Sequence, residues 1–529
     1  GITAFAPISL SNDNTGHFLV SLFQVIAISL LLSWVLAISI VPLFSSYLLK
    51  TGSGQSEDDL YSGRLYQPYK RLLSISLRHA WLTSVIVFGI VLISIWGLGS
   101  VRQAFFPTTN SPLFYIDYRL NEGTDIQHTS EDVRLLEAKL QEMPGVEAVT
   151  LFTGRGPPRF SATMRPEQPN PAYAQFVVRV ADVTKMNSMM LETKAQLQAL
   201  RMDASVQVSR AEFSPAGKSK IEARFSGPEA AMLRKLSGQA LDVYLKQGLI
   251  DTKTDWRPQS LQLVPEYNEI NARIVGVTRQ DVARALSYNT LGVPLSLFRD
   301  GDKLLPIIAR APAEERGEIG ELMDREVWSP IGQAYIPMTQ VVNQLQLTMA
   351  NTTIFRRERE RTIIAQGNPP AGHNTQQIQA QVMEQIDAIT LPQGYSLQWG
   401  GEYEANIEAT TALGSKIPLA FGFMFVITIL MFGELRQPIV IWLTVPMILC
   451  GVVAGMLITN LPLTFPSFLG VLSLSGMLIK NCIVLIDEID KRLSEDEMSV
   501  ETLLLASISR LRPVLLATGT TIAGMAPLL

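Results

Sequence analysis

FPSFLGVLSLSGMLIKNCIVLI, at residues 465–486, is an apolar stretch long enough to cross a lipid bilayer as an α-helix. It holds one charged side chain, Lys480, with the polar Asn481 beside it. An ionisable group at this depth is costly, and such groups usually serve a function. Five more apolar stretches occur at 18–44, 80–100, 417–432, 438–459 and 513–529. The six stretches predict a polytopic α-helical membrane protein.

A mostly polar block of about 310 residues separates the second stretch from the third and is far too long for a loop. The chain has 44 Lys and Arg against 48 Asp and Glu, so it lacks the basic surface typical of nucleic-acid binding. We therefore expect no nucleic-acid partner. The two cysteines, Cys450 and Cys482, both lie in apolar stretches, so disulfides cannot hold the block together.

Positive charge in the short connections predicts the orientation, because cytoplasmic loops retain Lys and Arg. The connections 50–79, 433–437 and 487–512 carry Lys or Arg, whereas 460–464 carries none. The three charged connections are therefore expected in the cytoplasm, and the polar block on the outer side, which is the periplasm in a Gram-negative cell. An amphipathic segment at 60–77 is expected to lie along the cytoplasmic membrane surface.

The polar block alternates between strand and helix patterns. Residues 113–210 follow the order strand, helix, strand, strand, helix, strand, which is the split βαβ arrangement of a ferredoxin-like fold. This α+β arrangement is an antiparallel sheet with helices on one face. Its first helix is expected to begin at the capping pattern Thr129-x-x-Asp132.

A second unit of the same kind begins at residue 221 and is interrupted by an insertion at about 268–353. The pattern predicts its elements in this order: a helix opened by Ser226-Gly-Pro228, a strand at 361–367, a helix near 376–389 and a strand at 395–401. The insertion has a helix after Thr278 and a hairpin that turns at 299–302. Three soluble modules are therefore expected on one bundle of membrane helices.

The two ends of the chain resemble each other. Ala6-Pro7 lies near the start and Ala526-Pro527 near the close, about 520 residues apart, in similar surroundings. The chain starts at Gly1 and stops within an apolar run. These features predict one period of a tandem repeat, cut from a parent about twice as long, as in transporters built from duplicated halves.

Six motifs carry a resemblance to a known family: FFPTTN (105–110), NEINARIVGVTRQDVARAL (268–286), SPIGQAYIPMTQVV (329–342), GELRQPIVIWLTVPMILCGVVAG (433–455), SGMLIKNCIVLIDEID (475–490) and RLRPVLLATGTTIAGMAPLL (510–529). With these, the chain resembles the resistance-nodulation-division (RND) superfamily of proton-driven efflux permeases, most of all its hydrophobe/amphiphile branch. The likeness covers essentially the whole chain. It corresponds to the carboxy-terminal half of a twelve-helix parent without its last helix.

The resemblance implies a division of the chain into domains and an assembly. The implied domains are 1–49, the end of the fifth transmembrane helix and the sixth; 50–79, a cytoplasmic loop with an amphipathic helix; 80–100, the seventh helix; 113–213, a first porter module; 221–267 with 354–401, a second porter module; 268–353, a docking module; and 412–529, helices eight to eleven with the last truncated. It also implies a homotrimer in the Gram-negative inner membrane, joined by a periplasmic membrane-fusion adaptor to an outer-membrane channel. The protein would use the proton gradient and no cofactor to export small hydrophobic or amphiphilic compounds.

Lys480, Asn481 and Thr518 are the proton-relay residues that the resemblance implies. In the family, the matching Lys faces an aspartate pair on another helix, and that pair would belong to the amino-terminal half. Two plainer interpretations stay open. The long Lys480 side chain could reach the membrane surface near Asp487, and the Thr518 hydroxyl could bond a carbonyl of its own helix.

Substrate contact is expected from Tyr115, Phe152 and Phe160 of the first porter module, because aromatic side chains suit an adaptable apolar pocket. Core packing explains each of them equally well. Arg155 and Arg159, in the loop between the two phenylalanines, would favour anionic or amphiphilic substrates or would simply be solvated.

Three other functions compete with the export of hydrophobic compounds. Heavy-metal efflux, in the neighbouring RND branch, needs converging Met, Cys or His ligands, and the spacing of the Met and His residues predicts no metal site. A membrane-anchored enzyme would need a nucleophile with a base or a metal cluster, and no such motif is recognised. A non-transporting membrane scaffold would not need Lys480.

Overall fold

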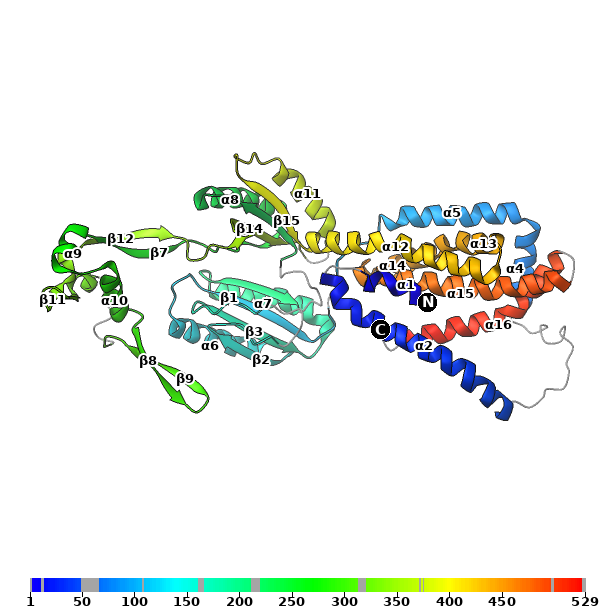
Figure 1. The fold of residues 1–529 in the computed structure, drawn as a ribbon, viewed down its shortest axis with the longest axis horizontal. Coiled ribbons are helices and arrows are strands. Elements are labelled where there is room, and N and C mark those ends of the chain that lie inside the picture. The colour runs from blue at the N-terminus through cyan, green and yellow to red at the C-terminus, as the bar shows by residue number, and fades with distance from the viewer. Residues whose placement is uncertain are drawn as a thin grey trace.

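The computed structural model is elongated, with membrane helices at one end, two α/β modules in the middle and an extended insertion at the far end (Figure 1). It describes residues 2–10, 14–48, 66–106, 109–159, 166–210, 219–312, 320–370, 373, 375–495 and 499–525. Among the predicted residues, Phe160 and part of the segment 60–77 lie outside these ranges.

Five helical segments in the described part are long and apolar enough to cross a membrane: Val20–Leu48, Ala80–Leu98, Glu402–Phe432, Arg436–Thr459 and Phe465–Ser494. The helices at this end are α1 (Ile2–Ser9), α2 (Asn14–Leu48), α4 (Tyr66–Arg78), α5 (Ala80–Leu98), α12 (Glu402–Phe432), α13 (Arg436–Thr444), α14 (Ile448–Thr459), α15 (Phe465–Glu495) and α16 (Val500–Met525). The predicted fold class, membrane helices with α+β modules, is confirmed.

Three predicted spans differ from the observed helices. The third is the end of α12, which already begins at Glu402 because polar residues extend the helix beyond its apolar part. The fourth is split between α13 and α14 by a 3-10 turn at Val445–Met447, where Pro446 cannot donate a helical hydrogen bond. The sixth is the second half of α16, whose charged first half starts at Val500.

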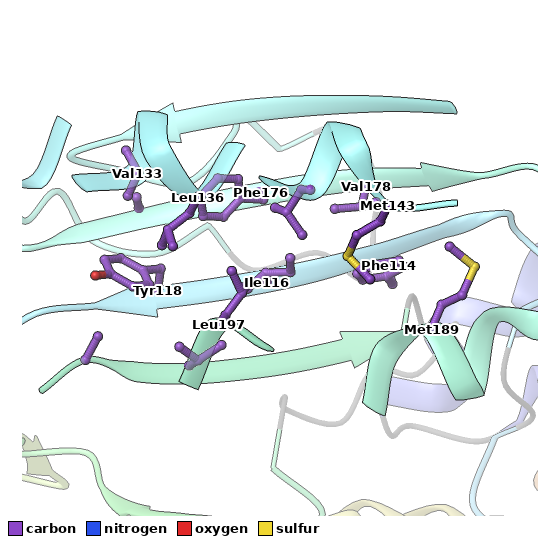
Figure 2. Close-up of a cluster of buried hydrophobic side chains, with 14 of the residues drawn as sticks. Phe114, Ile116, Tyr118, Val133, Leu136, Met143, Phe176, Val178, Met189 and Leu197 are labelled. Atoms are coloured by element: carbon purple, nitrogen blue, oxygen red, sulfur yellow. The ribbon is translucent and has the colours of Figure 1, made fainter. Parts of the chain in front are cut away.

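The first module has the element order that the sequence predicts. Its elements are β1 (Leu113–Arg119), α6 (Ile126–Glu142), β2 (Val146–Thr153), β3 (Tyr173–Val180), a 3-10 turn at Val183–Lys185, α7 (Met186–Leu200) and β4 (Ser205–Arg210). The antiparallel sheet has the order β2-β3-β1-β4, and both helices pack on one face. Figure 2 shows this core, where alternate residues of β1 meet apolar side chains of α6 and α7.

Helix α6 does not begin where the sequence predicted. Asp125 caps it by accepting a hydrogen bond from the Gln127 N–H. Thr129 and Asp132 lie inside the helix and are buried. The predicted start at Thr129 is therefore wrong, because Asp132 serves the tertiary structure: it accepts hydrogen bonds from the Tyr118 hydroxyl and, at 2.6 Å, from Arg201.

The second module repeats this topology. Its elements are β5 (Ile221–Ser226), α8 (Ala230–Lys246), β6 (Ile250–Thr254), β13 (Arg356–Arg357), β14 (Glu360–Asn368), α11 (Thr375–Asp387) and β15 (Ser396–Gly401). Strands β14, β5 and β15 are neighbours in the sheet, and β6 pairs with β14 at the edge. The order β6-β14-β5-β15 thus matches the order β2-β3-β1-β4 of the first module.

The insertion stands on a two-stranded ribbon of β7 (Ser260–Tyr267) and β12 (Val342–Ala350). It contains α9 (Glu269–Val275), α10 (Arg279–Asn289), β8 (Val293–Asp300), β9 (Lys303–Ala309), β10 (Glu326–Ser329), β11 (Ala334–Pro337) and 3-10 turns at Gly320–Asp324 and Met338–Gln340. The predicted helix after Thr278 is α10, which begins with a capping box between Thr278 and Asp281. The predicted hairpin is β8 and β9, with Gly301 in the left-handed region at its turn.

Candidate functional site

Lys480 lies at the middle of the 31-residue helix α15. Its neighbour Ile479 is buried against Met424 of α12 and Ile441 of α13. Since successive residues of a helix are rotated by about 100°, Lys480 projects from a different face. It is exposed, like Val484 one turn further along. One face of α15 therefore packs on the bundle, and the face with Lys480 is left uncovered by the described residues.

The side chains of Lys480 and Asn481 make no hydrogen bond or ion pair with any residue that the structure describes. Lys480 is exposed and Asn481 is half-buried. A lysine in the middle of an apolar span normally pairs with a carboxylate or a carbonyl, because its charge is costly in hydrocarbon. The chain thus carries a charge whose expected partner is not among the described residues.

Thr518 lies on α16 and is also exposed. Its hydroxyl donates a 2.9 Å hydrogen bond to the carbonyl of Val514 in the same helix. This is the bond that the plainer interpretation of Thr518 expected. The two helices are joined further along by Glu488 of α15, which accepts from Arg510 of α16 at 2.7 Å. The contact between Glu488 and Arg510 gives no local signal in the sequence, because the two residues are 22 positions apart.

Tyr115 and Phe152 share the sheet face that looks away from α6 and α7. The strand register places Phe152, Gln175, Asp117 and Gln207 in one row across the four strands. Tyr115 lies in the next row, opposite Val177. The structure therefore brings these two predicted residues to one surface, although neither is in the apolar core between sheet and helices.

A buried carboxylate lies near the centre of this face, which we call the open sheet face because neither α6 nor α7 packs on it. Asp117 accepts hydrogen bonds from the hydroxyl of Tyr173 and, at 2.8 Å, from the amide of Gln175. Burial and the neighbouring Asp117 raise the pKa of the Tyr173 phenol, so that it remains a hydrogen-bond donor at neutral pH. This group could not be predicted from the sequence, because a single acidic residue in a strand gives no signal of its own.

The loop after β2 lies over the edge of the open face. Gly156 is buried, and a Cβ atom there would be 3.0 Å from the side-chain oxygen of Gln175. Arg155 and Arg159, which flank it, are exposed. Phe160 lies outside the described residues. Both arginines are therefore at the rim of the face that holds Tyr115 and Phe152.

Three polar contacts join the two α/β modules along β6 and just after it. Lys194 of α7 pairs with Asp251 at 2.6 Å, Lys253 donates to Gln207 at 2.6 Å, and Arg257 pairs with Glu122 at 2.7 Å. The partners are 57, 46 and 135 residues apart in sequence, so no local pattern could indicate them. The second module thus lies along the edge of the first that is formed by α7 and β4.

Glu122 is well stabilised as a carboxylate in this contact. Burial works against its charged form, but hydrogen bonds from Asn170 and Arg257 prevail and hold its pKa below the usual range. We call the contacts made by Asp251, Lys253 and Arg257 the inter-module seam.

Metal ligands do not gather at this surface. In the described part of the chain, no three His, Cys, Asp or Glu side chains are grouped so that they could hold a metal ion. Met143, Met186 and Met189 all lie in the apolar core of the first module, where their thioethers pack against other apolar side chains.

Comparisons with known proteins give matches that cover nearly the whole chain. The model of the AcrB/AcrD/AcrF family matches residues 2–529. The swarming motility protein SwrC of Bacillus subtilis is 22% identical over 100% of this chain and 50% of its own length. The cobalt-zinc-cadmium resistance protein CzcA of Cupriavidus metallidurans is 22% identical over 95% of this chain and 48% of its own.

A crystal structure of a heavy metal efflux pump has a TM-score of 0.75 to this chain at 19% identity, and the match covers 97% of this chain and 52% of the other. The fold is therefore shared across the membrane helices and the soluble modules. The chain spans about half the length of the curated relatives it matches.

Proposed function

Since the chain belongs to the AcrB/AcrD/AcrF family of the RND superfamily, we propose that it is one half of an efflux transporter driven by the proton gradient. The observation that carries this proposal is Lys480, which is exposed at the middle of α15. A lysine in an apolar span normally pairs with a carboxylate or a carbonyl, and Lys480 has no such partner among the described residues, so we infer a carboxylate partner outside them.

In this proposal, carboxylates on a helix of the other half pair with Lys480 when they are ionised. Protonation of these carboxylates removes the attraction, so the face of α15 that holds Lys480 can separate from the partner helix. A charge-dependent contact between two packed helices supplies the two discrete states that a proton-driven transporter needs. Asn481 would orient the ammonium group or the carboxylates.

The test replaces Lys480 in the intact transporter. Lys480→Ala should abolish export and leave assembly unchanged, and Lys480→Arg should fail too, because a planar guanidinium does not replace a compact charge. Lys491→Ala is the matched control, since Lys491 is exposed on the same helix near its charged end. Wild-type export by Lys480→Ala would refute the relay and support a lysine that only reaches the membrane surface, or a protein that acts as a scaffold.

Heavy-metal cations are the cargo we propose first. The relative CzcA is named as a cobalt-zinc-cadmium resistance protein, and the matching crystal structure is that of a heavy metal efflux pump. These relatives support metal cations over the hydrophobic compounds that the sequence analysis expected. In this proposal the metal ligands come from the other half or from residues outside the described ranges, since the described part groups no such set.

Amphiphilic compounds are the second candidate cargo, and the open sheet face favours them. Tyr115 and Phe152 lie there, with Arg155 and Arg159 at the rim. The two cargo classes are separated by growth of cells that carry the intact transporter, challenged in parallel with Co²⁺, Zn²⁺ and Cd²⁺ and with deoxycholate and dodecyl sulfate. Protection against only one group identifies the cargo class.

For the assembly, we propose a trimer in the inner membrane that works with a periplasmic adaptor and an outer-membrane channel. The helices that can cross a membrane lie at one end of the molecule and the insertion at the other (Figure 1). This length suits a protein that spans a membrane and projects toward partners beyond it. Native mass spectrometry of the detergent-extracted transporter would show three copies if the proposal holds, and one or two copies would refute the trimer.

A further inference from the structure

Strand β15 of the second module runs directly into helix α12, because β15 ends at Gly401 and α12 begins at Glu402. Arg224 of the neighbouring strand β5 lies across this junction. Its guanidinium donates to Glu404, in the first turn of α12, at 2.6 Å and to Glu222 at 3.0 Å. The side chain of Arg224 is only 10% exposed. One buried arginine therefore ties the sheet to the first turn of a membrane helix.

Gly400 provides the space in which the Arg224 side chain lies. A Cβ atom at position 400 would be 2.2 Å from Cζ of Arg224, which is far inside van der Waals contact. The backbone of Gly400 is not in the left-handed region, unlike that of Gly401, whose φ is +72°. Glycine is thus required at 401 by the backbone, whereas at 400 the three nearest atoms that exclude a Cβ all belong to Arg224.

Glu402 connects the same turn of α12 to the helix of the proton relay. Its carboxylate accepts a 2.6 Å hydrogen bond from the N–H of Phe105. The Phe105 ring is 6.0 Å, centre to centre, from the ring of Phe465, the first residue of α15. These rings and Leu413 of α12 belong to one buried cluster. The beginning of α15 is therefore packed against α12, close to the residues that hold Arg224.

We propose that Arg224, held in the space above Gly400, is a positioning residue that makes β15 and α12 one rigid lever, so that movement of α15 reaches the second module and drives cargo transport. This inference rests on the proposed function. A largely buried ion pair of this kind gains little stability over apolar residues of the same volume. Its value here lies in a fixed geometry: the planar fork of an arginine holds two carboxylates at once, one on the sheet and one on the helix.

Gly400→Ala is the decisive variant, because it displaces the guanidinium without removing a charge or straining the backbone. Arg357→Ala is its matched control. Arg357 is the other arginine on Glu404, at 3.1 Å, but it lies on the surface with 44% of its side chain exposed. The intact transporter would be reconstituted in vesicles that contain a pH-sensitive dye. The probe is Co²⁺ or deoxycholate, whichever the wild-type protein moves.

We expect Gly400→Ala to keep proton movement while the amount of cargo moved per proton falls about tenfold, a size typical of coupling between two sites. Arg357→Ala should keep the wild-type ratio. A purely structural role would lower both fluxes together and lower the melting temperature, and that result would overturn the inference. A wild-type ratio in Gly400→Ala would overturn it as well.

Arg224→Lys provides a second measure if Gly400→Ala does not assemble. It keeps a positive charge between the carboxylates but cannot bridge both with a planar fork, so the ratio should again fall. An unchanged ratio of cargo to protons would contradict the proposal.

Failure of the proposed function has a different signature: the wild-type protein would move no protons, or Lys480→Ala would be as active as wild type. If both behave as proposed and only Gly400→Ala stays fully coupled, the lever alone is refuted.

Discussion

Lys194 Nζ lies 2.6 Å from Asp251 Oδ1, and this ion pair joins helix α7 of the first module to strand β6 of the second. The Asp251 side chain is 9% exposed and that of Lys194 is 29% exposed, so the pair is partly shielded from solvent. Asp251 also has a left-handed backbone, with φ at 55°. Asp251, the first residue of the inter-module seam, therefore combines a left-handed backbone conformation with an ion pair to the other module.

Asp251→Asn should loosen the seam. Asparagine tolerates the left-handed region as well as aspartate does, so the change removes the charge alone. We expect a cost of about 1 kcal/mol to the contact between the modules, and a smaller difference from wild type in high salt. Spin labels at the exposed residues Leu135 and Leu245, in a protein without Cys450 and Cys482, would report a broader distance distribution.

Lys139→Ala is the control for the seam, because Lys139 pairs with Glu142 on the surface of one helix. It should leave the distance distribution unchanged. If Asp251→Asn gives the same distribution as wild type, then packing and not the ion pair holds the modules together.

The repeated α+β topology could be predicted from the sequence because its signals are local. Alternate residues of β1, such as Phe114 and Ile116, are fully buried, and this period of two is visible along the chain. The start of α6 was missed because two capping patterns compete, and only the tertiary structure shows that Asp132 is engaged with Tyr118. The start of α12 was missed because hydropathy marks only the apolar part of a helix.

The inter-module seam and the Arg224 junction could not be predicted, because their residues meet across the fold. Arg224 and Glu404 are 180 residues apart, and neither belongs to a recognisable motif. By contrast, Lys480 could be identified from sequence alone, because a charge within an apolar stretch is unusual in itself. Which face of α15 carries it became known only from the packing of Ile479.

The stability of the second module should depend on pH through Asp255. Burial raises the pKa of Asp255 to about 7, although the N–H groups of Ile364 and Trp256 favour its charged form. A carboxyl whose pKa is raised on folding binds its proton more tightly in the folded state. The stability that the Asp255 carboxyl contributes is therefore fully present below the unfolded pKa, near 4, and is lost as the pH rises through the folded pKa of about 7.

Asp255→Asn tests this pH dependence, because the amide oxygen can still accept the 2.8 Å hydrogen bond from the Ile364 N–H. The free energy of unfolding, measured by chemical denaturation, should fall less in the variant than in wild type between pH 4 and pH 7. If the free energy of unfolding changes equally with pH in the two proteins, the Asp255 carboxyl is ionised throughout this range.

Thr518 should matter less than Lys480, since its hydroxyl can at most relay or orient a proton. Thr518→Ala should lower export several-fold, and Thr518→Ser, which keeps the hydroxyl, should be mild. Thr520→Ala is the matched control, because Thr520 is also exposed on α16 and donates to its own helix, at 2.9 Å to the carbonyl of Leu516. If the Thr518 and Thr520 variants export equally well, the Thr518 hydroxyl serves only its own helix.

The open sheet face can be tested by removing its aromatic and charged groups separately. If amphiphiles bind there, Phe152→Ala should cost about 1.5 to 3 kcal/mol of binding for bulky apolar substrates, the value for burying such a side chain, and Phe152→Leu should cost less. Replacement of both Arg155 and Arg159 by Gln should weaken export of anionic amphiphiles and spare neutral ones, because only charged ligands gain from a guanidinium. Export of Co²⁺ should be unchanged or improved, since two positive charges at the rim repel a cation.

Drug and metal susceptibility of cells carrying each variant would show which pattern holds. An equal loss for every cargo would mean that the loop supports the module, and no loss at all would place the binding site elsewhere.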